Sequence, residues 1–394
     1  MKHLKAILLA FALALACVAE ASAWKGPSLP PEAMLNGTDK FDWDLVPRIS
    51  DKPSLAAYIH ACVEARMERI PVVFDKGFYV KPLELLVNYM LLPWSSDKTV
   101  FQNGRERHVL YKVRYYPGMR VADAYRRGSP AGLYREERRL YEKALPIVQE
   151  AMQIPNLLER ELFIHDRITS SCSFTKLDDG STETMPRHTT ALGVLLDGRA
   201  NCQGYSDAFY MLGRMCGLQV EMMAGRAANG GHTWNTIELD GRTYIVDLTW
   251  NDESFVMDGK KYSTYIYFNA PREIAQATHQ WDRGYEPPNL AERIDGKYFY
   301  CAPEWRSTQG RLFGSSWDSP RNGLEGLAAS IARNGWRMNY AMVPYDAAWS
   351  RSERANKYLL DELGRQGWHG EVGFSVTSNA HWQWMFYTID ARRQ

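Results

Sequence analysis

The sequence predicts an α+β fold in which a helix that carries a cysteine packs on an antiparallel sheet. Two observations predict this core: apolar residues recur at helical spacing after Cys202, and Asp240-Gly241 separates two strand-like segments. Shorter helical and strand-like patterns lie on either side of this region. We therefore expect a central α+β core with small α+β segments flanking it.

The segment that follows Cys202 has the pattern of an amphipathic helix. Its apolar residues are Tyr205, Ala208, Phe209, Leu212, Met215 and Cys216. This spacing predicts one buried face, and Gly217 is placed to end the helix. Cys202 then lies at the helix start, where the helix dipole favours a thiolate and backbone N–H groups can bind an oxyanion. Gly198 and Gly204 leave room for close backbone approach around it.

The dipeptide Asp240-Gly241 favours a two-residue hairpin turn. The cross-strand pairs that follow from such a turn are Leu239 with Arg242, Trp234 with Asp247, and His232 with Thr249. Because side chains alternate between faces, His232 and Asp247 share one face and become diagonal neighbours, about 7 to 8 Å apart at the backbone. A slip of one residue would place them on opposite faces.

Cys202, His232 and Asp247 are, in that chain order, the residue types of a cysteine nucleophile, its base and the group that orients the base. Each residue alone has an ordinary explanation: a small core thiol, a satisfied polar histidine and an aspartate that serves a turn. The helix-start cysteine and the shared face of the hairpin favour a catalytic triad for the three together.

The region from about residue 138 to residue 281 resembles the transglutaminase-like superfamily, whose core is shared with papain-type cysteine proteases. The resemblance rests on the segments Phe163-Ile164-His165-Asp166-Arg167-Ile168, Asn201-Cys202-Gln203-Gly204-Tyr205, Gly231-His232-Thr233-Trp234-Asn235 and Val246-Asp247-Leu248-Thr249-Trp250. It implies a papain-like core in which Cys202 attacks a carboxamide or peptide carbonyl, His232 acts as base and then acid, and Asp247 orients His232. Neither an acidic calcium loop nor runs of β-sandwich strands occur, so the resemblance is to a small bacterial, exported member.

Other residues extend this candidate site. Gln203 could lend its side-chain amide to the oxyanion, with the Cys202 backbone N–H as the safer donor. Trp234 and Trp250 are expected to wall the cleft, and Trp234 is the better candidate for substrate contact; simple sheet packing is the alternative. We interpret His279 as structural, because no spacing argument places it near Cys202.

Residues 1–23 have the pattern of a secretory signal peptide, with Lys2 and Lys5, an apolar run over 6–16 and the small residues Ala21-Ser22-Ala23. We predict cleavage after Ala23 and a periplasmic or secreted protein. The apolar run is shorter than the roughly 20 residues of a membrane span, and no later segment approaches that length. Cleavage removes two lysines and one glutamate from a chain of net charge +1. The resulting neutral chain argues against nucleic acid or an anionic membrane as main partner.

Five cysteines remain after cleavage, namely Cys62, Cys172, Cys202, Cys216 and Cys301. An odd number fits one nucleophile with two disulfides, or one disulfide with buried thiols. Cys172 could lie near the site, although a structural half-cystine is the favoured interpretation. No Cys-x-x-Cys or His-Glu-x-x-His spacing occurs, so we expect neither a metal nor an organic cofactor. A metal site formed by His232, His279 and Asp247 is the alternative.

The expected domains are the signal peptide at 1–23, an N-terminal α+β region at 24–137, a catalytic domain at 138–295 and a small C-terminal α+β domain at 296–394. In the N-terminal region we expect a helix capped by Ser54 and strands at 71–74 and 109–116, the second with one exposed face. The mixed charges of 135–139 predict a solvated helix face. In the C-terminal region we expect helices around 324–334 and 350–359, and strands at 336–343, 371–377 and 382–389.

The sequence therefore predicts an exported cysteine enzyme that acts on peptide, isopeptide or carboxamide bonds through a thioacyl intermediate. Hydrolysis is favoured over transamidation, because water needs no second binding site. The expected partner is a peptide or protein substrate, and the cell envelope is one source of such substrates. The alternative is a catalytically silent binding module of the envelope, in which Cys202 is oxidised, paired with Cys172 or buried. The acyl donor and the oligomeric state stay open.

Overall fold

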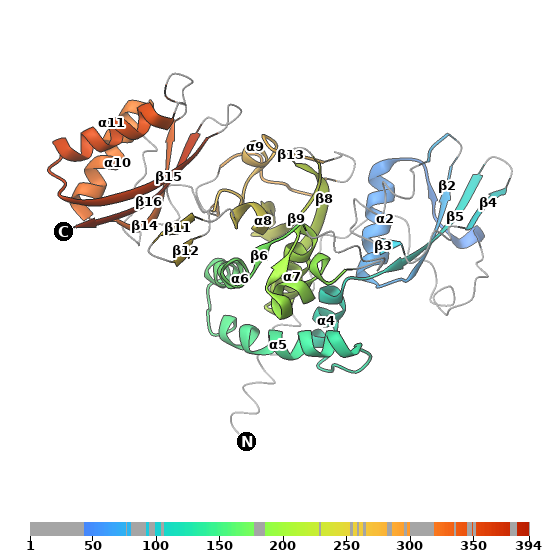
Figure 1. The fold of residues 1–394 in the computed structure, drawn as a ribbon. Helices are drawn as coiled ribbons and strands as arrows, with labels where there is room; N and C mark the ends of the chain where they lie inside the picture. The colour runs from blue at the N-terminus through green and yellow to red at the C-terminus, as the bar shows by residue number, and fades with distance from the viewer. Residues whose placement is uncertain are drawn as a thin grey trace. The chain divides into compact units, whose positions relative to one another are not determined.

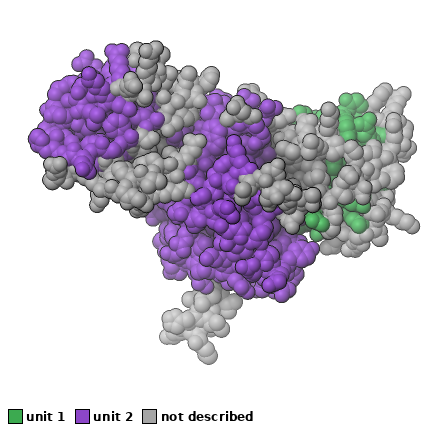
Figure 2. All heavy atoms as spheres, viewed as in Figure 1, with its two compact units in different colours: residues 1–85, 93–114 green, residues 86–92, 115–394 purple. Residues whose placement is uncertain are grey.

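The chain divides into two compact units, residues 1–85 with 93–114 and residues 86–92 with 115–394 (Figure 1 and Figure 2). The computed structural model describes residues 43–75, 77–79, 92–93, 99–103, 106–176, 186–227, 230–252, 255–257, 260–262, 265–281, 286–294, 298–299, 319–334, 336–344, 349, 352–378 and 384–393. The predicted signal peptide lies outside these residues, and the predicted domain boundaries stay predictions. No helix within the described ranges is long and apolar enough to cross a membrane.

The first unit contains a five-stranded sheet and one long helix. Its elements are η2 Trp43–Leu45, β1 Arg48–Ile49, α2 Lys52–Glu64, β2 Arg69–Phe74, β4 Thr99–Asn103 and β5 Glu106–Arg114. The sheet has the order β1-β2-β5-β3, where β3 is Leu92–Pro93, and β4 also pairs with β5. Helix α2 buries Leu55, Tyr58, Ile59, Cys62 and Val63, as its apolar stripe predicts.

Two expectations for this unit need correction. Asp51, not Ser54, caps α2, because the Asp51 carboxylate accepts a hydrogen bond from the Ser54 backbone N–H at 2.8 Å. The prediction that one face of β5 is exposed is also wrong. On that face Leu110 is buried, and Lys112 and Arg114 are half-buried. Strand β5 pairs with both β2 and β4 and is therefore an interior strand of the sheet.

The central part of the second unit is a helix-on-sheet core, as predicted. Its helices are α4 Pro117–Arg126, α5 Arg135–Ala151, α6 Leu157–Ser171, η3 Arg187–Thr189, η4 Gly193–Asp197, α7 Cys202–Met215, α8 Leu248–Asn251 and α9 Arg272–Ala275. Its strands are β6 Ser173–Phe174, β7 Arg199–Ala200, β8 Gln219–Ala227, β9 Gly230–Leu239, β10 Arg242–Val246, β11 Phe255–Met257, β12 Lys260–Tyr262 and β13 His279–Gln280. The main sheet is antiparallel with the order β10-β9-β8-β13, and α7 packs against β8 and β9 (Figure 1).

The hairpin of β9 and β10 has the predicted register. Its turn residues Asp240 and Gly241 both have positive φ, 49° and 73°, and the pairs run from Arg242 with Leu239 to Val246 with Asn235. The strand then ends at Val246, three residues before the last predicted pair. Asp247 becomes the N-cap of α8, so Thr249 lies in that helix and does not face His232 across the sheet.

The start of helix α5 differs from the solvated face expected for residues 135–139. Its mixed-charge start is not wholly solvated, because Glu137 is buried and accepts a hydrogen bond from Arg120 Nε at 2.9 Å. The Glu137 carboxylate also accepts the backbone N–H of Tyr134, the residue before the helix. One member of the charged run therefore fastens the helix to its surroundings.

The C-terminal residues form helices packed beside an antiparallel sheet, with a hydrophobic core of their own. The elements are α10 Pro320–Asn334, β14 Trp336–Pro344, α11 Ser352–Arg365, β15 Gly370–Ser378 and β16 Trp384–Arg393. The antiparallel sheet has the order β14-β16-β15, and α10 and α11 pack together beside it (Figure 1). The apolar stripe Leu324, Leu327, Ala328 and Ile331 is fully buried, as predicted. The proposed capping residue Ser350 lies outside the described residues.

Candidate active site

Cys202 is the first residue of α7, and the residues around it define that position. The Asn201 side chain caps the helix by accepting the backbone N–H groups of Gln203 and Gly204 at 3.0 and 3.2 Å. The Cys202 N–H has no acceptor within the helix, as is general for a first turn. It therefore stays the candidate oxyanion donor, whereas the Gln203 N–H is already engaged. Gln203 itself is half-buried beside Cys202.

Gly204 allows the neighbouring segment to approach the start of α7. A Cβ at this position would lie 2.7 Å from the His188 carbonyl oxygen and 2.8 Å from the Ala200 Cβ. The Asn201 N–H also donates to the His188 carbonyl, at 2.9 Å. Gly204, the second residue after the cysteine, is thus required for the close packing at the helix start.

Asn235 holds the histidine strand against the cysteine helix. Its side-chain amide donates to the Ser206 carbonyl on α7 at 3.0 Å and to the Glu221 carbonyl on β8 at 3.2 Å. Asn235 is buried, and its bond to the Ser206 carbonyl is shielded from water. His232 lies three residues earlier on β9, and this bridge therefore fixes its strand relative to Cys202.

His232 and Asp247 form the pair that the hairpin register predicts. His232 Nε2 donates to Asp247 Oδ2 at 2.7 Å, and the His232 ring also hydrogen-bonds the Cys202 side chain. Because Nε2 is engaged by the carboxylate, Nδ1 is the ring nitrogen left for the thiol. The three predicted residues therefore meet, in the order thiol, imidazole, carboxylate.

Asp247 fills both of the roles that the sequence left open for it. Its Oδ1 accepts the backbone N–H groups of Thr249 and Trp250 at 2.9 and 3.1 Å and so caps α8, while Oδ2 faces His232. Asp247 is 0% exposed. The helix cap holds the carboxylate in place, and the same carboxylate orients the imidazole.

The charges of this pair stabilise each other. Burial opposes the protonation of His232, but the Asp247 charge, its hydrogen bond and the contact with Cys202 together raise the pKa of His232 to about 10. Burial likewise opposes the ionisation of Asp247, but His232 and a second histidine, His279, keep the pKa of this carboxyl below its usual range. At neutral pH the site therefore holds a carboxylate and an imidazolium, and the imidazolium is in contact with the Cys202 side chain.

His279, for which the sequence favours a structural interpretation, contacts the carboxylate of the site. Its Nε2 lies 3.0 Å from Asp247 Oδ2, the same oxygen that His232 contacts. No local spacing in the sequence brings His279 to the site. Strand β13, which carries it, has two residues and pairs with β8, His279 opposite Ala227. Such a long-range pairing leaves no periodic pattern in the sequence.

Trp234 does not line an open cleft. Its side chain is 0% exposed, so the predicted contact with substrate is wrong for this structure and the packing alternative holds. The Trp234 ring lies edge-on to His279, with the centroids 4.9 Å apart, and packs in one cluster with Met223 and Ile245. Trp250 is half-buried, and its ring centroid lies 5.8 Å from that of His232. Of the two tryptophans, Trp250 is therefore the better candidate for contact with substrate.

All four described cysteines are thiols, with no disulfide among Cys62, Cys172, Cys202 and Cys216. This corrects the interpretation of Cys172 as a half-cystine; Cys301 lies outside the described residues. Cys172 is buried, and its thiol contacts the side chain of Tyr205. Burial raises the pKa of Cys62 and of Cys216 to about 12. Within the described part of the chain, Cys202 is the only cysteine that is not buried.

The cluster around Asp247 also has the composition of a metal site. One ligand atom each of His232, Asp247 and His279 lies within 4.8 Å of the others. The hydrogen bonds from both histidines to Asp247 already account for this arrangement. A metal is therefore not needed to explain why the three side chains are close.

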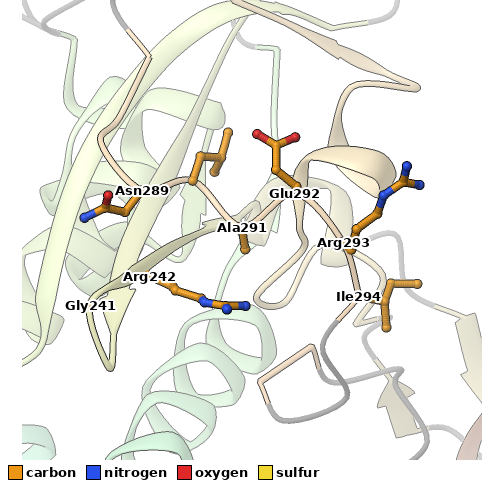
Figure 3. Close-up of a pocket in the computed structure, with 8 residues that line it drawn as sticks. Gly241, Arg242, Asn289, Ala291, Glu292, Arg293 and Ile294 are labelled. Atoms are coloured by element: carbon orange, nitrogen blue, oxygen red, sulfur yellow. The ribbon is translucent and has the colours of Figure 1, made fainter.

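A cavity of about 580 Å³ lies at the turn end of the hairpin and is distinct from this site. It is lined by Gly241, Arg242, Asn289, Leu290, Ala291, Glu292, Arg293 and Ile294 (Figure 3). Arg242 is the first residue of β10 and lies five residues before Asp247, about 16 Å for an extended chain. Figure 3 shows the Arg242 side chain beneath Ala291, whereas the Arg293 side chain points away from it. The charged groups therefore do not converge on one point.

Comparison with known proteins matches the region that carries the site. A family model described as the transglutaminase-like superfamily matches residues 147–247. Kyphoscoliosis peptidase from Mus musculus is 28% identical over 86 residues, which cover 19% of this chain and 13% of the mouse protein. The chain thus spans only a small part of that curated relative. The family match confirms the resemblance inferred from the motifs.

Two solved structures are similar at low identity. One is a TGase, at 13% identity and a TM-score of 0.28, covering 57% of this chain and 62% of the other. The second is a proposed cysteine protease from Cytophaga hutchinsonii, at 13% identity and a TM-score of 0.24, covering 50% of this chain and 76% of the other.

Proposed function

The chain carries a domain of the transglutaminase-like superfamily, and on that premise we propose that it is a cysteine-dependent acyl-transfer enzyme. Its substrates are peptide, isopeptide or carboxamide bonds. The observation that carries the proposal is the contact chain from the Cys202 thiol through His232 to Asp247, with a 2.7 Å hydrogen bond between the imidazole and the carboxylate. This is the arrangement that activates a cysteine nucleophile.

The reaction follows from the positions of these groups. The Cys202 thiolate attacks the carbonyl carbon, and the negative charge that develops on the oxygen is bound by the Cys202 backbone N–H. The His232 imidazolium gives its Nδ1 proton to the leaving nitrogen, which departs as an amine or ammonia and leaves a thioester on Cys202. The incoming water or amine attacks the thioester carbon while neutral His232 accepts its proton, and the C–S bond then breaks, which releases the acid or new amide and restores the Cys202 thiolate and the His232 imidazolium. Asp247 keeps the ring oriented through Nε2 in both steps.

We further propose that water is the usual acceptor and that the protein is exported. Hydrolysis is favoured because it needs no second binding site for an amine. Export is supported by the signal-like pattern of residues 1–23, and peptides of the cell envelope would be accessible substrates in that compartment.

Limiting iodoacetamide at pH 6, followed by peptide mapping, tests the nucleophile. We expect Cys202 to be alkylated at least tenfold faster than Cys62, Cys172 and Cys216, because it alone of these thiols is not buried and it contacts His232. A reaction of Cys202 no faster than a free thiol in a denatured control would contradict the proposal.

Activity is tested by incubating the mature protein with a peptide library and by measuring released amines, with and without an added primary amine. The Cys202→Ala variant should abolish the release, while the matched Cys216→Ala variant should retain it, because Cys216 is a buried thiol at the far end of α7. If an unreactive Cys202 still allowed tight retention of envelope material, the silent binding module would be the better description.

A further inference from the structure

Two histidines share one oxygen of the Asp247 carboxylate. His232 Nε2 lies 2.7 Å and His279 Nε2 lies 3.0 Å from Asp247 Oδ2. We propose that His279 is a positioning residue which, through Asp247, sets how strongly His232 holds its proton. The role of His232 in this inference rests on the proposed function.

The hydrogen bonds assign the protons of this cluster. An ionised carboxylate can only accept, so both Nε2 atoms carry a proton. If His279 is neutral, its Nδ1 accepts, and the Thr278 hydroxyl, 2.9 Å away, is its donor. The Tyr267 hydroxyl lies 2.8 Å from the Thr278 oxygen and donates to it in turn. The alternative acceptor for Thr278, the Ala275 carbonyl, is farther away at 3.4 Å. The tyrosine, threonine and histidine thus donate in one direction, toward the carboxylate.

His279 cannot act as a base toward substrate, because its ring cannot contact a substrate. Its side chain is 0% exposed. The rings of Trp234, Trp250 and Tyr267 each lie with centroids 4.9 Å from that of His279. His232, by contrast, keeps 9% of its side chain exposed and contacts the thiol. The two histidines on one carboxylate therefore have different tasks.

The consequence of the second donor is electrostatic. Asp247 is fully buried, and each of its oxygens has two donors: two backbone N–H groups on Oδ1 and two imidazoles on Oδ2. The donation from His279 satisfies part of the carboxylate charge and leaves less of it for His232. Without His279, Asp247 would hold the His232 imidazolium more tightly, and His232 would give up its proton less readily.

The test is a pH titration of His232 by NMR in protein labelled with ¹⁵N-histidine, with the resonance assigned from a His232→Gln variant. In His279→Leu we expect the His232 midpoint to rise by about one pH unit, the lower end of the range for a lost neighbouring interaction. At the wild-type midpoint, the ratio of protonated to neutral His232 would rise about tenfold. His279→Gln, whose amide can still donate to Asp247, should restore most of the wild-type midpoint.

A second variant keeps the test decisive if His279→Leu does not fold. Thr278→Val removes the donor to Nδ1 while leaving His279 in place, and it should raise the His232 midpoint by a smaller amount. The matched control is Thr243→Val, which removes a comparable hydroxyl bond, 2.7 Å to the Pro288 carbonyl, near the hairpin turn. It should leave the midpoint unchanged.

An unchanged or lowered His232 midpoint in His279→Leu or Thr278→Val overturns the inference, even if the melting temperature falls. A fall in melting temperature alone would assign His279 a structural role. The titration needs no substrate, so its failure is distinguishable from failure of the proposed function, which alkylation of Cys202 reports.

Discussion

Replacing Asp247 by asparagine tests the central geometry of the site. The carboxylate accepts four hydrogen bonds, two from backbone N–H groups on Oδ1 and two from imidazoles on Oδ2. An asparagine amide has one oxygen and one NH₂ group, so it can accept on one side only. Either the cap of α8 or the pair of histidines then faces a donor in place of an acceptor.

The expected magnitude follows from His232. Its pKa is raised from 6.5 to about 10, and each unit corresponds to about 1.4 kcal/mol. After the opposing effect of burial, the site therefore favours the imidazolium by a net amount on the order of 5 kcal/mol, and the asparagine removes the Asp247 charge that contributes most to it. At neutral pH His232 would become largely neutral and would no longer stabilise a thiolate. The comparable substitution in a serine protease lowers kcat by about 10⁴.

The assay measures the rate of Cys202 alkylation and the rate of peptide cleavage in Asp247→Asn. We expect alkylation at pH 6 to slow at least tenfold and kcat/KM to fall by about 10³ to 10⁴. Asp197→Asn is the matched control, because Asp197 pairs with Arg187 at the surface. Alkylation and cleavage within threefold of wild type would refute the assignment of Asp247 to the site.

Three further predictions concern stability. Gly225→Ala would place a Cβ 2.2 Å from the Gln280 carbonyl oxygen and 2.6 Å from Trp234 Cη2, so we expect urea denaturation to show a loss of about 2 to 3 kcal/mol. Gly230→Ala, with open space around its Cβ, is the control, and equal losses would contradict the reasoning. Burial raises the pKa of Glu161 from 4.5 to about 8, so the stability present below pH 4.5 is lost as pH rises through 8. Glu161→Gln should therefore exceed wild type at pH 8 by on the order of 4 kcal/mol, and parallel stability curves from pH 5 to 8 would argue against this. Tyr205→Phe removes the hydroxyl that donates to Asp252 at 2.5 Å and should cost about 1 to 3 kcal/mol in thermal unfolding; a loss below about 0.5 kcal/mol would show that the bond contributes little.

The cysteine helix and the histidine hairpin could be predicted because their signals are local. The apolar stripe from Tyr205 to Cys216 encodes the buried face of α7, and Asp240-Gly241 encodes the turn that sets the register of β9 and β10. Both signals come from residues that are close together in the sequence, where the spacing of apolar residues and backbone preferences determine the local structure. The thiol, imidazole and carboxylate of the candidate site were therefore identifiable from the motifs.

The remaining features of the site depend on contacts between distant segments. His279 reaches Asp247 because β13 pairs with β8, and buried Trp234 packs against the rings of His279 and Trp281. Cys172 is a thiol packed against Tyr205, which no count of cysteines could reveal. The residues that carry the reaction could thus be recognised in the sequence, because local patterns of spacing and turn residues identify them. Their burial, and the number of donors that share one carboxylate, were settled only by packing, because desolvation and hydrogen bonding depend on every segment that meets there.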